Sequence, residues 1–336
     1  MFTELAALLL PWYKENRREL PWRQDKAPYH VWLSEIMLQQ TRVEAVKGYY
    51  ARFLQKLPTI RDLAAADEET LYKLWEGLGY YSRVRNLHKA ANQILERHGG
   101  AFPTDYHDVR ALAGIGDYTA GAICSICFDL PTPAVDGNVL RVCTRLTADP
   151  TPIDSPAMKK QLTARLAEAY PESSGDFTQA LMELGATVCV PNGAPKCMVC
   201  PLSHICLAHG QGKETSFPVK SEKKPRKIVE MTVLLLHDGD TYALHKRPKT
   251  GLLAGLWEFP HLDGRHTVAQ VLEHLEHLGI HVTEVEKTVE KTHIFTHVQW
   301  NMTGIFLQCR PDDHFTWADP NDHALPTAFR IFLDES

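Results

Sequence analysis

The fold of this chain is decided by one short stretch, which reads Leu112-Ala113-Gly114-Ile115-Gly116-Asp117-Tyr118-Thr119-Ala120-Gly121. Its Gly-Ile-Gly step predicts that one helix ends here and that another begins at once. Such a turn exposes backbone N–H groups at a helix N-terminus, and no side chain at Gly114 or Gly116 keeps a phosphate away from them. The stretch therefore favours a helical fold with an anion-binding turn between two helices.

Two carboxylates stand out on either side of this stretch. Twenty residues after Gly116, the run Val135-Asp136-Gly137-Asn138-Val139 holds an acidic side chain beside a tight turn. Asp136 by itself indicates no more than a helix N-cap. Glu35 is surrounded in sequence by apolar residues, so we expect burial to raise its pKa; these neighbours are Trp32, Leu33, Ile36 and Met37.

The sequence as a whole predicts two domains joined by a linker. Its 336 residues, 44% hydrophobic and 23% charged, are typical of a globular protein with more than one core. Apolar residues recur every three or four positions as far as residue 210, which predicts an all-α domain over 1–210. Helices are expected at Ile60 to Glu76, Ser82 to Gly99 and Pro156 to Tyr170.

The rest of the chain changes character. Residues 211–227 are rich in Gly, Ser, Pro and Lys and predict a basic linker. Residues 228–336 predict an α+β domain: a hairpin of Ile228 to Leu236 with Thr241 to His245, a helix at Val268 to Leu278, and strands at Val289 to Phe295 and Met302 to Gln308.

Net charge argues against a general basic surface. The chain carries −5 overall, made up of −1 over residues 1–200, +4 over 201–227 and −8 over 228–336. Any contact with nucleic acid must therefore depend on backbone amides and a few placed cations. The longest apolar run near the start, Leu5 to Pro11, is too short to span a bilayer and lacks the features of a secretory signal, so a cytoplasmic protein is expected.

Four of the eight cysteines are clustered. Cys189, Cys197, Cys200 and Cys206 have the spacing C-x7-C-x2-C-x5-C, which suits four thiolate ligands of Zn²⁺ or of a [4Fe–4S] cluster. Spacing alone does not choose between the two. Cys124 and Cys127 fall in an apolar helical run and are expected to be core residues.

Taken in order, these motifs resemble the helix–hairpin–helix DNA glycosylase superfamily and, within it, the A/G-specific adenine glycosylases of the MutY family. The resemblance runs the length of the chain. It is carried by Leu20 to Arg23, Val31 to Thr41, Gly77 to Arg83, Leu112 to Gly121, Val135 to Val139 and the four cysteines. It implies a helix–hairpin–helix glycosylase domain followed by a Nudix-like domain, and a monofunctional enzyme of base-excision repair that removes adenine opposite 8-oxoguanine or guanine in double-stranded DNA, as a monomer.

The resemblance also implies roles for the residues of the reaction. The four cysteines would hold a [4Fe–4S] cluster, although seven residues separate Cys189 from Cys197 where the family usually has six. Glu35 would donate a proton to adenine N7, and ionised Asp136 would stabilise the sugar cation. The family places Tyr118 and Asn138 beside Asp136.

Tyr118 separates the two subtypes of this superfamily. In bifunctional relatives such as endonuclease III, a Lys at this point forms a Schiff base with the sugar, which a phenol cannot do. A bifunctional glycosylase and lyase is therefore the alternative that Tyr118 disfavours. A cluster-bearing DNA-binding protein without activity is disfavoured by the presence of both carboxylates.

DNA contacts are implied by the same resemblance. Those near the extruded adenine are Trp22, Arg23 and Gln179, and those near the opposite base are Leu38, Gln40, Thr41 and Tyr80. From sequence alone, Gln40 and Gln179 could equally be solvated helix residues. The hairpin glycines Gly114 and Gly116 would face the DNA backbone.

The last domain lacks the carboxylate pairs with which Nudix hydrolases hold Mg²⁺, so nucleotide hydrolysis is not expected. The family reads 8-oxoguanine with a Phe-Ser-His loop in this domain. Phe295, Thr296 and His297 occupy that place here. The alternative is that this segment has no binding role and is a strand end with a capping Thr and an exposed His.

Overall fold

The computed structural model describes residues 2–222 and 225–335. They form two compact units, one made of Met1–Ala66 with Arg85–Glu222 and the other of Asp67–Val84 with Lys223–Ser336. The break after Glu222 falls inside the expected linker. Residues Asp67–Val84 differ from the expected division, because they group with the C-terminal unit although the sequence placed them within the helical domain.

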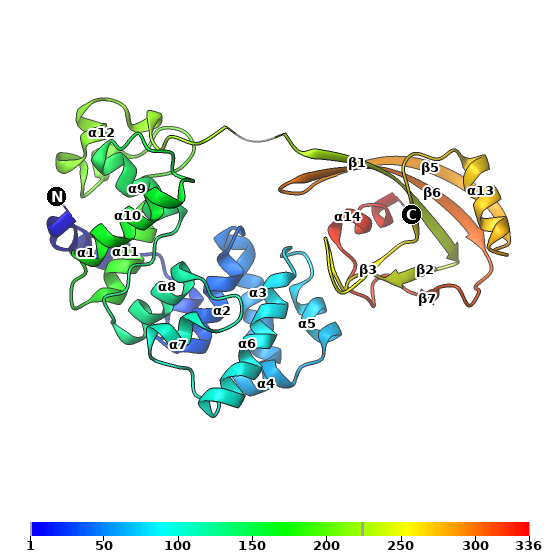
Figure 1. The fold of residues 1–336 in the computed structure, drawn as a ribbon, viewed down its shortest axis with the longest axis horizontal. Coiled ribbons are helices and arrows are strands. Elements are labelled where there is room, and N and C mark those ends of the chain that lie inside the picture. The colour runs from blue at the N-terminus through cyan, green and yellow to red at the C-terminus, as the bar shows by residue number, and fades with distance from the viewer. Residues whose placement is uncertain (1, 223–224, 336) are drawn as a thin grey trace. The chain divides into compact units, whose positions relative to one another are not determined.

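The first unit is helical, as the periodicity predicted (Figure 1). Its helices are α1 (Leu5–Asn16), α2 (Pro28–Leu38), α3 (Val43–Lys56), α4 (Ile60–Ala65), the greater part of α6 (Ser82–His98), α7 (Tyr106–Arg110), α8 (Asp117–Phe128), α9 (Gly137–Thr147), α10 (Pro156–Ala167), α11 (Ser174–Thr187) and α12 (Leu207–Gly210). No helix in the described ranges is long and apolar enough to cross a membrane.

The single helix expected over Ile60 to Glu76 is wrong. Helix α4 ends at Ala65, and a separate helix α5 (Glu68–Trp75) follows. The chain is extended at Ala66, and the carboxylate of Asp67 accepts a hydrogen bond of 2.8 Å from the backbone N–H of Thr70. An Asp at this position caps a new helix more readily than it continues an old one, and the apolar period cannot register that.

The helical hairpin at Gly114 to Gly116 is confirmed. Helix α7 ends at Arg110, α8 begins at Asp117, and Gly116 is the N-cap residue of α8. Gly114 has φ +75°, and a Cβ there would lie 2.5 Å from the Cβ of Asn86. Only glycine fits this turn, because the backbone is left-handed and α6 approaches closely.

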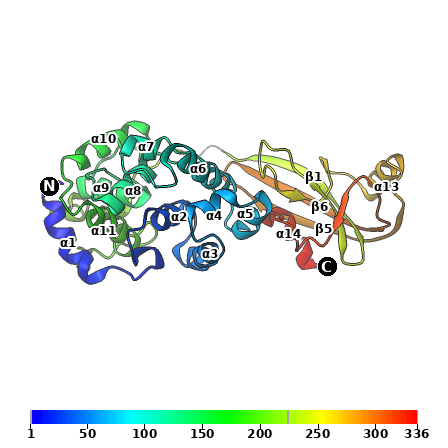
Figure 2. The same ribbon diagram turned by 90° about the horizontal axis from the view of Figure 1, so that it is seen from below.

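Helix α11 is the centre of the first unit and contacts α1, α8 and α9, while α2 packs on α8. Figure 2 shows α1, α9 and α11 gathered at one end of this unit. Their core is apolar and includes Leu9, Val142, Phe177 and Leu184. Helix α2 is buried from Val31 to Met37, so any polar side chain on it is removed from water.

The second unit is built on a mixed sheet with the strand order β3-β2-β1-β6-β5. Its described strands are β1 (Lys227–Asp238), β2 (Thr241–Lys246), β3 (Trp257–Glu258), β4 (His261–Asp263), β5 (Val282–Ile294), β6 (Val298–Cys309) and β7 (Thr316–Ala318). The predicted hairpin of β1 and β2 is confirmed, and β1 also pairs in parallel with β6. Strands β5 and β6 form an antiparallel hairpin that is longer than the sequence predicted.

Each face of this sheet carries its own core. Alternate residues of β1 point to opposite faces, so Val233 and Leu235 pack with α14 (Thr327–Arg330), and Leu234 and Leu236 pack with α13 (Val268–His277). The two helices lie on either side of the sheet in Figure 1.

Segment Asp67–Val84 joins the second unit through polar contacts that the sequence did not predict. Glu76 pairs with Arg330 at 2.5 Å, Glu69 pairs with His323 at 2.9 Å, and the ammonium of Lys73 donates to the backbone carbonyl of Asn321. Each pair joins residues more than 240 positions apart in the chain, which no local pattern can reveal.

Candidate active site

A cavity of about 370 Å³ in the first unit collects ten of the predicted site residues. They come from the 3-10 turn Pro21–Arg23, the end of α2, and the N-terminal turns of α8 and α9 together with α11. The predicted residues that line the cavity are Trp22, Arg23, Glu35, Leu38, Gln40, Thr41, Tyr118, Asp136, Asn138 and Gln179. The hairpin glycines Gly114 and Gly116 are not among the residues that line it.

Glu35 lies in the wall of this cavity with only 6% of its surface exposed. The hydroxyl of Tyr118 donates to its carboxylate at 2.5 Å. Burial raises the pKa of Glu35 to about 7; the hydrogen bond from Tyr118 opposes the shift, and the nearby charge of Asp136 adds to it. The carboxyl group is therefore poised to hold or release a proton near neutral pH.

Asp136 is both a helix N-cap and a cavity residue. One carboxylate oxygen accepts from the backbone N–H of Val139 at 2.7 Å, and the other accepts from the side-chain amide of Asn138 at 2.6 Å. Burial raises the pKa of Asp136, while both hydrogen bonds lower it. Both donors favour the ionised carboxylate, because neither can accept a proton from it.

An ion-pair network that was not predicted from the sequence lies on the same cavity. Glu183 on α11 is fully buried and binds the guanidinium groups of Arg18 and Arg23 at 2.6 and 2.7 Å. Burial would raise the pKa of Glu183, but the hydrogen bonds and charges of the two arginines outweigh it and the pKa is lowered. Glu183 follows Gln179 by one helical turn, and this spacing was the one available signal that it faces the cavity.

The loop after α2 has an unusual backbone. Gln40 has φ +59°, a left-handed conformation that is costly for a residue with a side chain. The preceding Gln39 donates to the hydroxyl of Thr119 at 3.4 Å. Leu38, Gln40 and Thr41 therefore lie at the cavity on a turn that its neighbours hold in place.

The predicted opposite-base residues Tyr80 and Thr296 meet in the second unit. Their hydroxyl oxygens are 2.7 Å apart. Thr296 lies in the turn between β5 and β6, which is closed by a hydrogen bond of 2.8 Å from the N–H of Phe295 to the carbonyl of Val298. The ring of Phe295 packs against Trp300 with its centroid 4.8 Å away, and the side chain of His297 is exposed.

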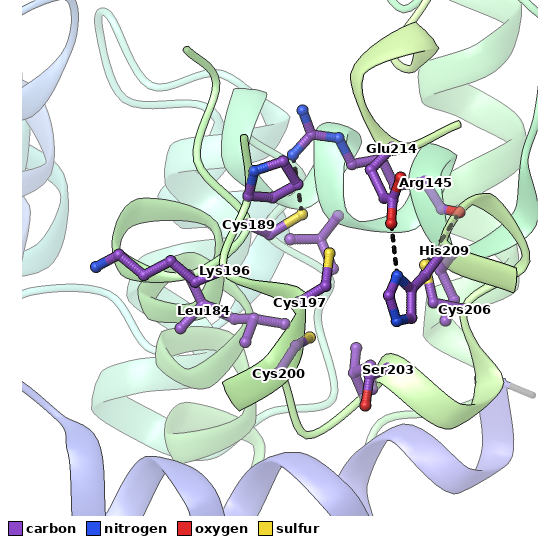
Figure 3. A pocket seen from close by; sticks show the side chains of 15 residues that line it. Arg145, Leu184, Cys189, Lys196, Cys197, Cys200, Ser203, Cys206, His209 and Glu214 are labelled. Atoms are coloured by element: carbon purple, nitrogen blue, oxygen red, sulfur yellow. Dashed lines mark hydrogen bonds and ion pairs between the residues drawn. The ribbon is translucent and has the colours of Figure 1, made fainter. Parts of the chain in front are cut away.

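The four clustered cysteines line a second cavity in the first unit (Figure 3). Leu146, Leu184, Val188 and Leu202 give this cavity apolar walls. Arg145 donates to the sulfur of Cys189 at 3.3 Å, and such a cation compensates thiolate charge. The ring of His209 contacts the carboxylate of Glu214 at 2.5 Å beside Cys197.

The sulfur atoms are spread more widely than one zinc ion requires. Tetrahedral zinc with Zn–S bonds of about 2.3 Å places its sulfurs about 3.8 Å apart. Within the described residues, no three of the four sulfur atoms lie within 4.8 Å of one another.

One guanidinium connects the two cavities. Arg141 on α9 donates to the side-chain oxygen of Asn138 at 2.8 Å, to the carbonyl of Gly185 at 2.8 Å, and to the carbonyl of Cys189 at 2.7 Å. The start of the cysteine loop and the residue beside Asp136 are therefore fixed by the same side chain.

Comparison with known proteins matches both parts of the chain. Residues 33–169 match the HhH-GPD superfamily of base excision DNA repair proteins, and residues 231–335 match the NUDIX domain. The adenine DNA glycosylase of Rattus norvegicus is 38% identical over 87% of this chain and 68% of its own length. That of Homo sapiens is 35% identical over 91% and 67%, and that of Schizosaccharomyces pombe is 31% identical over 94% and 84%.

Solved structures resemble the helical part. A thermostable thymine-DNA glycosylase has 25% identity and a TM-score of 0.56, over 62% of this chain and 97% of its own. A non-covalent endonuclease III–DNA complex has 22% identity and a TM-score of 0.54, over 63% and 98%. The second likeness concerns the fold alone.

Proposed function

The chain belongs to the adenine DNA glycosylase family, and from this premise we propose that it hydrolyses the N-glycosidic bond of adenine mispaired with 8-oxoguanine or guanine in double-stranded DNA. The observation that carries the proposal is the single cavity that holds Glu35, Tyr118 and Asp136. A base cannot be reached inside a duplex, so the adenine must be extruded into this cavity.

Glu35 is the general acid of this reaction. When the bond from C1′ to N9 breaks, its electron pair passes to the base, and adenine is a poor leaving group as an anion. A proton given by Glu35 to adenine N7 removes that charge. Burial, which raises the pKa of Glu35 to about 7, keeps a large fraction of the carboxyl protonated at neutral pH.

Asp136 stabilises the other half of the broken bond. Departure of the base leaves positive charge on C1′ and the ring oxygen, and a carboxylate fixed by Asn138 and Val139 offsets it without having to reorient. Water then adds its oxygen to C1′ and gives a proton to the Glu35 carboxylate, which restores the acid. The products are free adenine and an abasic site.

The enzyme is monofunctional. A lyase step needs an amine to attack C1′, and no lysine is found among the described residues that line the cavity. Tyr118 occupies the position of the lyase lysine and donates to Glu35 instead.

The second unit reads the base opposite adenine. Tyr80 and Thr296 present two adjacent hydroxyl groups, and 8-oxoguanine differs from guanine in an N7–H donor and an O8 acceptor that a hydroxyl can match. Phe295 and His297 flank Thr296 in the same turn.

Cys189, Cys197, Cys200 and Cys206 hold a [4Fe–4S] cluster, which orders the loop that carries them. The wide spacing of their sulfurs and the cation of Arg145 beside Cys189 support this proposal. Purified protein should contain about four iron and four sulfide ions per chain, the composition of a cubane cluster. Stoichiometric zinc in place of iron would contradict it.

The function is tested with three duplexes, carrying A opposite 8-oxoguanine, A opposite guanine and A opposite thymine. We expect excision from the first two and none from the third. Strands should stay intact until alkali is added, and borohydride should trap no covalent adduct. Efficient strand cutting without alkali would instead favour the bifunctional alternative. Elution of the free and DNA-bound protein at one chain per complex would support a monomer.

A further inference from the structure

The turn that carries Tyr80 has a demanding backbone. Gly77, Gly79 and Tyr80 have φ values of +92°, +69° and +49°. Glycine adopts this region freely, but a tyrosine there costs on the order of 1 to 2 kcal/mol. Tyr80 is nevertheless 51% exposed, so burial of this residue does not compensate for the strained backbone.

Arg83 lies behind this turn and is only 7% exposed. Its terminal nitrogen donates to the carbonyls of Leu78 and Gly79 at 2.8 and 3.1 Å. Its guanidinium lies over two aromatic rings, 5.3 Å from the centroid of Trp75 and 5.6 Å from that of Tyr80. These distances are within the range of cation–π attraction.

Trp75 completes the support from the helix before the turn. Its indole N–H donates to the carbonyl of Gly79 at 3.1 Å, so that carbonyl accepts from Trp75 and from Arg83. One planar cation with several donors can bind two carbonyls and cover a ring at the same time. A lysine ammonium can do only part of this.

We propose that Arg83 is a positioning residue for recognition of the opposite base: it fixes the turn of residues 77–82 so that Tyr80 is presented to DNA beside Thr296. Arg83 itself is nearly buried and acts through Tyr80. The inference rests on the proposed role of Tyr80 in reading the base opposite adenine, and two experiments separate the two claims.

The first experiment uses no DNA. Amide hydrogen exchange is measured on the full-length protein for peptides that span residues 77–83, in wild type, Arg83→Met and Arg83→Lys. The N–H of Leu78 and that of residue 83 are hydrogen-bonded within this turn and report its opening.

Exchange should be about tenfold faster in Arg83→Met and intermediate in Arg83→Lys, as expected for loss of one desolvated cation–π contact with its hydrogen bonds. Arg97→Met, the same change at an exposed position on the same helix, is the matched control and should exchange as wild type does. Unchanged protection of the turn in both Arg83 variants would overturn the proposal.

The second experiment is a double-mutant cycle on binding. Affinity is measured for a duplex with 8-oxoguanine opposite 2′-fluoro-2′-deoxyadenosine, which resists excision. In an otherwise wild-type chain, Arg83→Met should weaken binding about tenfold. In a chain that carries Tyr80→Leu, it should weaken binding less than about twofold, because the group that it positions is gone.

An equal, multiplicative loss in both backgrounds would show that Arg83 acts independently of Tyr80 and would overturn the proposal. If Tyr80→Leu alone binds as wild type does, the reading role of Tyr80 fails, and the exchange experiment still decides whether Arg83 orders the turn. Arg83→Lys keeps the charge and gives the same comparison if Arg83→Met does not fold.

Discussion

Burial of the Glu35 carboxyl serves its proposed role as an acid and lowers the stability of the fold. The side chain is held among apolar residues of α2, with Tyr118 as its hydrogen-bond donor, and its pKa is raised to about 7. The protonated form is the one that the reaction needs and the one that the fold prefers.

The rate of excision should follow this ionisation. Because the acid must be protonated, the single-turnover rate on A opposite 8-oxoguanine should fall as the pH rises through about 7. Glu35→Gln should be slower by on the order of 10²-fold and independent of pH in this range. A wild-type rate that climbs steadily from pH 6 to pH 9 would contradict Glu35 as the acid.

The raised pKa of Glu35 also predicts that Glu35→Gln increases the stability of the folded protein. The folded state holds the Glu35 proton up to pH of about 7, whereas the unfolded chain releases it at its ordinary pKa of 4.5. The free energy of unfolding therefore decreases as the pH rises from 4.5 to about 7. Above this range it is lowered by the full cost of ionising the buried carboxyl.

Urea unfolding of wild type and Glu35→Gln at pH 5 and pH 8 measures this cost. The free energy of unfolding of Glu35→Gln, taken relative to that of wild type, should be up to about 3 kcal/mol higher at pH 8 than at pH 5. An identical difference at both would mean that Glu35 is ionised in the folded protein throughout.

Glu35 could be found from the sequence because the signal was local. Its apolar neighbours lie within three positions, and they are buried as expected. The ion pairs of Glu183 could not, because the arginines that stabilise its charge are 165 and 160 positions away. Its sequence neighbours are as apolar as those of Glu35, yet its pKa is shifted in the opposite direction.

At the scale of elements, helices α9 and α11 meet at Asn138, in the first turn of α9. A Cβ on Gly185 of α11 would lie 2.5 Å from the Cβ of Asn138, closer than two side chains can approach. The close contact of α9 and α11 therefore depends on a glycine, and Asp136 with its donors is placed by that contact.

Gly185→Ala should destabilise the protein by about 1 to 3 kcal/mol, the usual cost of overpacking, and should slow excision by displacing Asn138. Gly48→Ala on α3 is the control, because Gly48 is exposed and a Cβ there would meet only the guanidinium of Arg52, at 3.3 Å. That variant should be neutral or slightly stabilised. Thermal unfolding and single-turnover rates measure both, and wild-type behaviour of Gly185→Ala would contradict the argument.

Helices and strands were predicted well where the spacing of apolar residues determines their bounds. They were predicted poorly where a single capping side chain determines them. The long helix α6 and the hairpin of β1 and β2 follow from spacing. The break between α4 and α5 depends on Asp67 as a cap, and an apolar pattern that continues through it hides the break.

At the scale of the whole molecule, the residues proposed for excision lie in the first unit, and those proposed for discrimination lie in the second. A chain ending at Glu222 keeps every residue of the cavity that holds Glu35, Tyr118 and Asp136, the excision cavity, and should still remove adenine. It lacks Thr296, so its preference for 8-oxoguanine over guanine should decrease. Thr296→Val removes one hydroxyl and should reduce the preference by roughly 1 kcal/mol, about fivefold. Single-turnover rates on both mispairs measure this, and an unchanged ratio in both variants would show that Thr296 and the rest of residues 223–336 contribute nothing to recognition.

The ion pair between Glu76 and Arg330 and the hydrogen bond between Glu69 and His323 also have a consequence for protein synthesis. Each pair joins residues 254 positions apart. At translation rates of about 5 to 20 residues per second, α5 waits roughly 10 to 50 s on the ribosome for its partners. Every residue of the excision cavity has emerged long before then. The residues proposed to cut the glycosidic bond are therefore synthesised before Thr296, which is proposed to help choose the adenine that is cut.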